Sequence, residues 1–171
     1  TEKENLRILL RKQGIEVSDE EFTNLFNMTG RNYVSSNGDV VLLPYVKAVI
    51  ERLSRVCLLG LSTGNPEIIA RKKLQRVGLD NYFKVGGFGN ESEHRGEIVR
   101  LAVNRARSHG WRGDGKNGYL MGDTAKDIAS GKYASLVTIG VLTGSGTREQ
   151  LEYSKPDYII ENFSKLEKIL V

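Results

Sequence analysis

Two aspartates four residues apart, Asp123 and Asp127, are the residues whose types and spacing point most directly to chemistry. They follow a short apolar run, 119–121, and a glycine, a pattern typical of a buried strand that ends where a helix begins. The first carboxylate then lies at the carboxyl edge of a sheet, and the second lies one helical turn later and faces the same space. Because facing carboxylates repel each other, the pair predicts a site for a hard divalent cation.

A second apolar run, 56–61, leads into the residues Ser62-Thr63-Gly64-Asn65-Pro66. This pattern predicts another strand, which brings a hydroxyl group and free backbone N–H groups to the start of a helix. Gly64 lets the backbone approach an anion, the helix start adds partial positive charge, and the Thr63 hydroxyl adds a donor. An ordinary helix cap would show the same residues, so this segment alone leaves an anion site and a cap open.

Arg95 is predicted to begin a helix after the loop 89–94. A cation at a helix start opposes the helix dipole, and a bound anion would offset that cost. A solvated arginine is the alternative on this pattern alone. The two histidines, His94 and His109, lack partners at the spacing of metal ligands, and neither is predicted to be a catalytic base.

The composition is that of a globular domain, with 39% hydrophobic and 27% charged residues among 171. The net charge of +4 is spread along the chain without a basic block, which argues against a nucleic-acid partner. No apolar run approaches the length of a membrane span, and the polar start does not resemble a signal peptide. The single cysteine, Cys57, excludes an intrachain disulfide and is predicted to be buried in a strand, so a reducing cytoplasm is the expected location.

The elements that must position these residues change in character near residue 40. Residues 1–40 show an amphipathic helix over 4–12, a capping box at Ser18 and Glu21 before a second helix, and a loop over 30–38. We interpret them as a small helical element set apart from the core.

The rest of the chain, 41–171, alternates helices with continuous apolar strands, which predicts a parallel sheet covered on both faces. The predicted strands are 56–61, 82–88, 119–121, 136–141 and 158–160, and the predicted helices are 43–53, 66–78, 95–108, 124–133, a short one after Thr147, and 163–170. In such sheets ligands bind at the carboxyl ends of the strands, where Thr63, Asp123 and Thr143 fall.

Taken together, these residues resemble the haloacid dehalogenase-like hydrolase superfamily, particularly its phosphoglycolate phosphatase-like members. The likeness covers nearly all of 41–171. It is carried by these segments in order: Gly60-Leu61-Ser62-Thr63-Gly64-Asn65, Lys73-Leu74 with Gly78-Leu79, Tyr82-Phe83, Gly86-Gly87-Phe88-Gly89, Gly122-Asp123-Thr124-Ala125-Lys126-Asp127-Ile128 and Thr143-Gly144-Ser145.

The resemblance implies a Rossmann-like three-layer α/β/α sandwich with a small helical cap, which residues 1–40 would supply in part. It implies a Mg²⁺-dependent phosphomonoester hydrolase that acts on a small phosphorylated metabolite. Thr63, with Gly64 and Asn65, takes the position of the phosphate-binding hydroxyl. Arg95 takes the basic position that steadies the phosphate and the nucleophile, where most members have lysine. Asp123 and Asp127 take the positions that hold Mg²⁺.

The sequence departs from the family at the catalytic pair. The family's chemistry begins with an Asp-x-Asp motif on the first strand, whose first aspartate attacks phosphorus and whose second protonates the leaving group and then activates water. The 171 residues contain no such motif, and Asp39 lacks a second aspartate and follows the cap segment. We therefore expect that the first core strand and the nucleophile are missing from this chain, that the chain alone is inactive, and that the gap pairs with an N-terminal segment or with another chain.

Two other classes of function remain open. The first is a non-catalytic module of the same fold that binds a phosphoryl ligand or a protein partner. The second is a nicotinamide or flavin oxidoreductase, which is disfavoured because Ser92 stands where the dinucleotide fingerprint that begins at Gly87 requires glycine.

Overall fold

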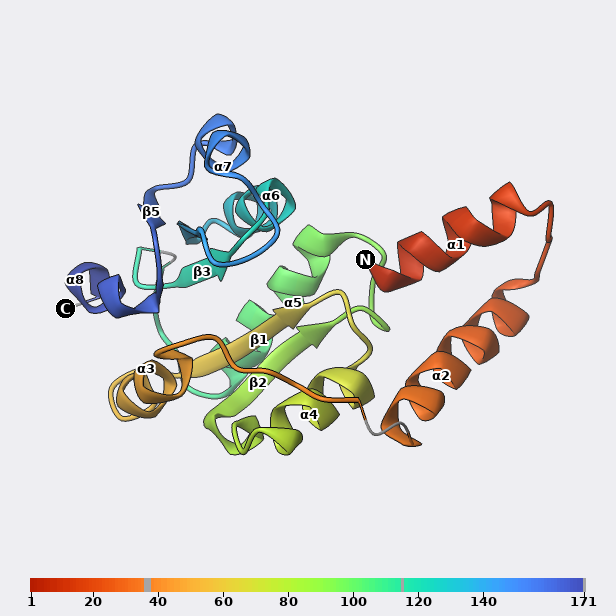
Figure 1. Cartoon of the computed structure of the whole chain (residues 1–171), viewed down its shortest axis with the longest axis horizontal. Coiled ribbons are helices and arrows are strands. Elements are labelled where there is room, and N and C mark those ends of the chain that lie inside the picture. Colours follow the sequence, from red (N-terminus) through yellow and green to blue (C-terminus); the bar gives the residue numbers. More distant parts are fainter. Residues whose placement is uncertain (36–37, 115, 171) are drawn as a thin grey trace.

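The computed structural model of the chain describes residues 1–35, 38–114 and 116–170, and it has the predicted α/β architecture with parallel strands (Figure 1). The strands form two sheets. In the first, β1 (Leu59–Thr63) pairs with β2 (Phe83–Phe88). In the second, the order is β3 (Tyr119–Gly122), β4 (Val137–Val141) and β5 (Tyr158–Ile160). Within the described residues no strand joins β1 to β3. The single sheet that was predicted is therefore divided into two sheets, each made of parallel strands.

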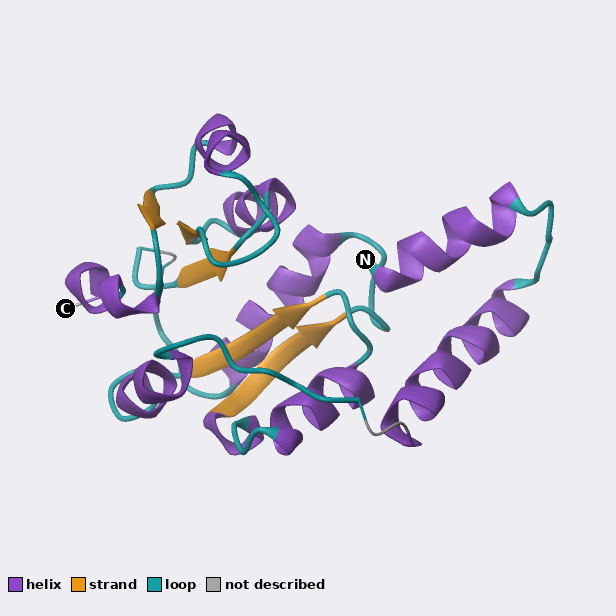
Figure 2. Ribbon diagram, viewed as in Figure 1, coloured by secondary structure: helices purple, strands orange, loops and turns teal. Residues whose placement is uncertain are grey.

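The helices lie around these two sheets (Figure 2). They are α1 (Glu2–Lys12), α2 (Asp19–Ser35), α3 (Val46–Leu53), α4 (Glu67–Arg76), α5 (Arg95–Ser108), α6 (Ala125–Tyr133), α7 (Arg148–Ser154) and α8 (Glu167–Leu170), with short 3₁₀ turns at Asp80–Tyr82 and Phe163–Lys165. The last predicted helix, 163–170, is therefore a 3₁₀ turn followed by α8. No helix in the described part of the chain combines the length and the apolar character that a membrane span requires.

Two helices tie the sheets together. Helix α5 packs on β1 and β2 and also against α6 of the other half. Its contact with β2 is so close that a Cβ at Gly87 would lie 1.9 Å from the carbonyl oxygen of Ile98. Helix α3 contributes Val49 and Leu53 to the buried cluster of the second sheet. The remaining members of that cluster are Ile139, Val141, Ile160 and Leu166. Helix packing thus holds the carboxyl ends of the strands in place in both sheets.

Helices α1 and α2 form where the capping signals predict them. Thr1 and Glu4 make one capping box, and the N–H and hydroxyl of Ser18 donate to Glu21 ahead of α2. The predicted loop over 30–38 is wrong for its first part, because α2 continues to Ser35. Gly30 explains this, since a Cβ there would lie 2.8 Å from Ile68 Cγ2 and its absence lets α2 pack on α4. Residues 36 and 37 of that loop lie outside the described residues, and the division of the chain at residue 40 stays a prediction.

The prediction for Cys57 is also wrong. Its side chain is exposed and β1 begins only at Leu59. The cause is local, because the N–H groups of Val56 and Cys57 both donate to the carbonyl oxygen of Leu53, at 3.0 and 2.7 Å. These residues therefore extend the last turn of α3 and do not enter the sheet.

Candidate functional site

The Thr63 hydroxyl lies at the carboxyl end of β1 and is held by the loop that follows. Its oxygen accepts hydrogen bonds from the backbone N–H and the side-chain Nδ2 of Asn65, each at 3.1 Å. Because both of its lone pairs are used in this way, the hydroxyl proton of Thr63 is available to a further acceptor. Asn65 is held in turn by Lys73 of α4, whose Nζ donates to Asn65 Oδ1 at 3.0 Å. Lys73 was not predicted as a site residue, since no spacing rule separates it from its basic neighbours.

Gly64 is buried at a crossing of three segments. A Cβ at this position would lie 3.1 Å from Thr1 Cα and 3.4 Å from Arg95 Nη1. The carbonyl oxygen of Gly64 accepts a hydrogen bond from the N–H of Glu2 at 3.3 Å. On the other side, the N–H of Gly89 donates to the carbonyl oxygen of Asn65 at 2.8 Å. A larger residue here would therefore need Thr1 or Arg95 to shift by a few tenths of an ångström.

Arg95 and Asp127, which the sequence placed in separate roles, form an ion pair with Nη2 and Oδ1 2.6 Å apart. Asp127 is buried, and its other oxygen, Oδ2, accepts from the N–H and hydroxyl of Thr124 at 3.1 and 2.7 Å. This second set of contacts is the capping box that begins α6. The positive charge of Arg95 thus has a carboxylate partner, and the solvated arginine considered as an alternative is not what the fold contains.

Asp123 lies after β3 and is enclosed by the loop that follows β4. Its Oδ2 accepts hydrogen bonds from the N–H and the hydroxyl of Ser145 at 2.6 and 3.0 Å. The loop approaches so closely that a Cβ at Gly144 would lie 2.0 Å from Asp123 Oδ2, and one at Gly146 would lie 2.0 Å from the Asp123 carbonyl oxygen. Within the described residues Oδ1 of Asp123 accepts no hydrogen bond, so this oxygen is open to a cation. Ser145 was part of the family resemblance, but no role for it was predicted.

The donor set at Asp123 and Asp127 suits a hard cation without forming a complete protein cage. Among the residues that the structure describes, no group of three or more His, Cys, Asp or Glu side chains could hold a metal ion. Mg²⁺ commonly takes only one or two carboxylates and completes its coordination with water and phosphate oxygens. Asp123 fits this need directly. Asp127 would have to share its Oδ1 with Arg95 or give up the ion pair.

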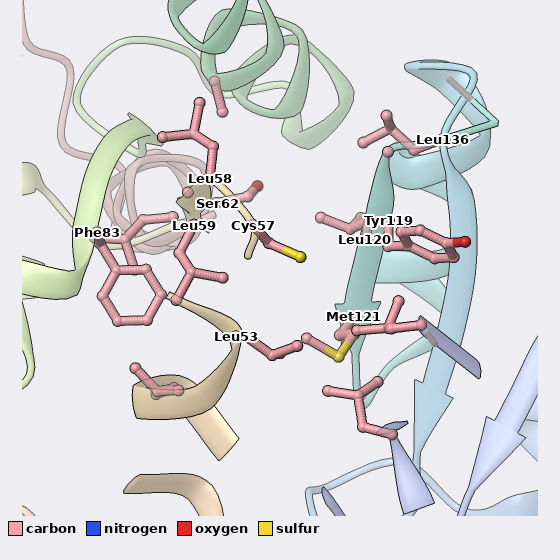
Figure 3. Close-up of a pocket in the computed structure, with 18 of the residues that line it drawn as sticks. Leu53, Cys57, Leu58, Leu59, Ser62, Phe83, Tyr119, Leu120, Met121 and Leu136 are labelled. Carbon is pink, nitrogen blue, oxygen red and sulfur yellow. The ribbon is translucent and has the colours of Figure 1, made fainter. Parts of the chain in front are cut away.

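The two sets of predicted residues lie at the same end of the molecule. Arg95 lies against Gly64 after β1 and pairs with Asp127 in α6, so it connects the two motifs. Ser62 and Asp123 both line a cavity of about 800 Å³ between β1 and β3. Figure 3 shows this cavity, with Leu59 of β1 on one side and Leu120 of β3 on the other. Thr143, the third residue predicted at this rim, lines the same cavity.

Two residues weighed in the sequence lie outside this arrangement. Asp39 is exposed, in a segment without regular structure ahead of α3. His94 caps α5, because its Nδ1 accepts from the N–H of Glu97 at 3.3 Å, and its ring packs edge-on against Tyr133. The contacts of His94 are those of a structural cap.

Known proteins share both the sequence pattern and the fold. Residues 95–166 match a family model described as HAD-hydrolase-like. A phosphoglycolate phosphatase of Agrobacterium fabrum is 28% identical over 127 residues, which are 72% of this chain and 53% of the relative. In sequence the chain is thus similar to haloacid dehalogenase-like hydrolases over these residues. Of the candidate residues, Arg95, Asp123 and Asp127 fall inside the segment that matches the superfamily model.

Solved structures share the fold over nearly the whole chain. A hydrolase of Pseudomonas syringae superposes with a TM-score of 0.73 at 18% identity and covers 99% of this chain and 80% of its own. A haloacid dehalogenase-like hydrolase of Streptococcus pneumoniae gives a TM-score of 0.69 at 15% identity over 91% of this chain and 72% of its own. The chain spans about half the length of the curated relatives that it matches, 53% and 46%.

Proposed function

We propose that these residues are part of a Mg²⁺-dependent phosphomonoester hydrolase that acts on a small phosphorylated metabolite. The observation that carries the proposal is the position of Arg95, which lies against Gly64 and pairs with Asp127 at 2.6 Å. The guanidinium group of Arg95 therefore lies between the Thr63 loop, which is suited to an anion, and a pair of carboxylates, which is suited to a metal. The 28% identity to a phosphoglycolate phosphatase supports the same class of reaction.

Each side chain has a role that follows from its surroundings. The free proton of the Thr63 hydroxyl and the N–H groups of its loop would bind oxygens of the phosphoryl group. Arg95 would add a charged donor to the same oxygens while Asp127 holds it in position. Asp123 and Asp127 would hold Mg²⁺, which when bound supplies positive charge to the phosphoryl group. Ser145 would keep the Asp123 carboxylate oriented through its two hydrogen bonds.

The proposed chemistry passes through an aspartyl phosphate. A carboxylate oxygen forms a bond to phosphorus while the ester oxygen leaves with a proton from a second carboxyl group. Water then attacks phosphorus, with its proton taken by that second carboxylate, and the enzyme carboxylate is released with inorganic phosphate. The 171 residues hold no Asp-x-Asp pair that could do this, so we propose that both aspartates belong to a segment outside them.

A phosphate-release assay tests the proposal in two parts. The chain of residues 1–171, incubated with Mg²⁺ and a panel of small phosphate esters, should release no phosphate above buffer, because loss of a covalent nucleophile removes a factor on the order of 10⁴ to 10⁶ in rate. A longer parent protein with an Asp-x-Asp strand should release phosphate, and EDTA should stop it. Phosphate release by residues 1–171 would refute the proposal that the nucleophile is missing from this chain. A longer parent protein that releases no phosphate would refute the proposal of a hydrolase.

A non-catalytic module that binds a phosphoryl ligand is the second candidate. The absence of a catalytic carboxylate pair from the sequence favours it, since the binding residues could act without chemistry. Binding of inorganic phosphate by a parent protein that never turns over an ester would select this candidate. For either function we propose a location in the cytoplasm, because the single cysteine fits a reducing compartment.

A further inference from the structure

The Thr63 hydroxyl lies at the end of a chain of contacts that begins on a distant helix. The backbone N–H and the side-chain Nδ2 of Asn65 both donate to the Thr63 oxygen, at 3.1 Å each. The remaining polar atom of the Asn65 side chain, Oδ1, accepts from Nζ of Lys73 on α4 at 3.0 Å. The same Nζ lies 5.3 Å from the centre of the Tyr33 ring, which belongs to α2. Helix α2 packs beside α4 (Figure 1), so these contacts join two helices to one loop.

Lys73 decides which way the amide of Asn65 points. An asparagine side chain has an acceptor oxygen on one side and a donor NH₂ group on the other, whereas a lysine ammonium has three donors and no acceptor. With Lys73 in place, Oδ1 must therefore face Nζ, and the NH₂ group must face Thr63. In the opposite orientation two donor groups, the ammonium and the NH₂, would face each other.

The orientation of this amide decides where the proton of the Thr63 hydroxyl points. While the NH₂ group donates to the Thr63 oxygen, the hydroxyl cannot give its own proton to Asn65, and the proton is directed to a further acceptor. If the amide turned over, Asn65 Oδ1 would accept that proton, and the hydroxyl would present only lone pairs to an incoming anion. A charged phosphoryl oxygen is attracted by the first arrangement and repelled by the second.

Lys73 can fix the amide only if its own side chain stays in one place. A lysine side chain has a flexible four-carbon stem and adopts many rotamers when it is free. Here the face of the Tyr33 ring attracts the ammonium through a cation–π contact. The ring also lies under Arg76 of α4, whose guanidinium carbon is 5.1 Å from the ring centre. The tip of Lys73 is therefore bound by two groups, one from the Thr63 loop and one from α2.

We propose that Lys73 is a positioning residue. It holds the Asn65 amide in the orientation that makes the Thr63 hydroxyl a donor to a phosphoryl oxygen, and the Tyr33 ring keeps it in place. The orientation of the amide is independent of any reaction, whereas its consequence for a phosphoryl ligand rests on the proposed function.

The first test needs no ligand. In the ¹⁵N-labelled chain, NMR relaxation gives an order parameter for the side-chain amide of Asn65. This value should be about 0.85, as in a rigid backbone, and should fall below about 0.6 in Lys73→Met, because the amide loses the donor that fixes it. Lys73→Arg should keep it high, since a guanidinium also carries only donors. Lys72→Met removes the same charge one residue away on α4 and should leave it unchanged. An amide that stays rigid in Lys73→Met would overturn the proposal.

Two variants at Tyr33 separate the ring from its hydroxyl. Tyr33→Leu removes the ring face that attracts Lys73, so the order parameter of the Asn65 amide should fall. Tyr33→Phe keeps the ring and loses only the hydroxyl, which lies 3.5 Å from Nη1 of Arg76, so the order parameter should not change. Equal values in these two variants would overturn the part of the proposal that concerns Tyr33.

Inorganic phosphate, titrated by calorimetry in the presence of Mg²⁺, tests the consequence for the ligand. Lys73→Met should weaken phosphate binding about tenfold more than Lys72→Met does, and Lys73→Arg should restore most of the affinity. In a Thr63→Val background Lys73→Met should cause no loss beyond that of Lys72→Met, because Lys73 acts through the missing hydroxyl.

A loss of the same size with and without the Thr63 hydroxyl would overturn the proposal, because the ammonium would then attract phosphate directly. If the unmodified chain binds no phosphate, the proposed function fails, and the order parameters of the Asn65 amide alone decide the role of Lys73.

Discussion

Asp127 carries two functions in this fold, because one carboxylate oxygen pairs with Arg95 while the other caps α6. The ion pair is largely shielded, with side-chain exposures of 9% for Asp127 and 31% for Arg95. A shielded pair is costly to break from one side, since the remaining charge is left without its partner. Loss of this carboxylate should therefore damage both the helix start and the position of the guanidinium.

The change Asp127→Asn should lower the free energy of unfolding by about 1–3 kcal/mol, because the amide keeps an acceptor for the cap but loses the charge that faces Arg95. Urea unfolding at pH 7 measures this. The matched control is Glu152→Gln on α7, whose partner Arg148 is 3.7 Å away and 53% exposed. Such exposed pairs contribute about 0–1 kcal/mol, so equal losses in the two variants would contradict this assignment.

The hydrogen bonds of Asp157 predict how the stability of the fold changes at acidic pH. The hydroxyl and the N–H of Thr138, each donating at 2.7 Å, hold the pKa of the Asp157 carboxyl below its ordinary value of 3.8. A pKa that is lower in the folded state means that the carboxylate stabilises the fold above pH 3.8, and that this stabilisation is lost as the pH falls through the folded value. The urea midpoint of Asp157→Asn should therefore fall less than that of the parent chain between about pH 5 and about pH 2. A parallel fall in both proteins would show that Asp157 does not contribute.

At the scale of elements, the contact of α5 with β2 fixes the first sheet to its helix. Gly87→Ala should lower the free energy of unfolding by more than about 3 kcal/mol, because the added Cβ would lie 1.9 Å from the backbone oxygen of Ile98, which cannot move without the helix. Gly140→Ala in β4 is the control, since its Cβ would meet only side-chain atoms at 3.4 Å or more. Thermal unfolding of the two variants should differ by several degrees, and similar melting temperatures would contradict the close contact.

The sequence predicted elements well where a local signal exists. The span of α5 over 95–108, the helix predicted over 124–133 and the short helix after Thr147 are all present in the structure, because their signals are local. It failed for residues 30–35, because Gly30 is a helix breaker by propensity and its close packing on Ile68 of α4 is a contact that the local pattern does not contain. The prediction for Cys57 failed in the opposite way. The apolar run predicts a strand, but the N–H of Cys57 donates to the last turn of α3.

The candidate site, too, could be predicted only where the sequence carries a local signal. Strand ends could be predicted, and with them the rim where Thr63 and Asp123 lie, because ligands gather at the carboxyl ends of parallel strands. The partners that hold these residues could not be predicted. Lys73 reaches back along α4 to Asn65, a contact that no spacing rule predicts. Ser145 reaches Asp123 from a loop 22 residues away, so this contact depends on how the elements pack.

At the scale of the whole molecule, the division between β1 and β3 is the feature with the largest consequence. Among the residues that the structure describes, the two sheets are joined through α3 and α5 and not through backbone pairing. Both halves of the candidate site lie across this division, with Thr63 on one side and Asp123 on the other. The packing of α3 and α5 against the two sheets should therefore also fix the distance between the hydroxyl and the carboxylate.

The central claim is that the Thr63 loop and the Asp123 carboxylate act on one phosphoryl group. Titration of the chain with inorganic phosphate by calorimetry, with and without Mg²⁺, tests it most directly, because two ligands that meet at one site must strengthen each other's binding. Mg²⁺ should tighten phosphate binding about tenfold, Asp123→Asn should remove this gain, and Thr63→Val should weaken binding in both conditions. A phosphate affinity that Mg²⁺ does not change, or a gain that survives Asp123→Asn, would contradict the account.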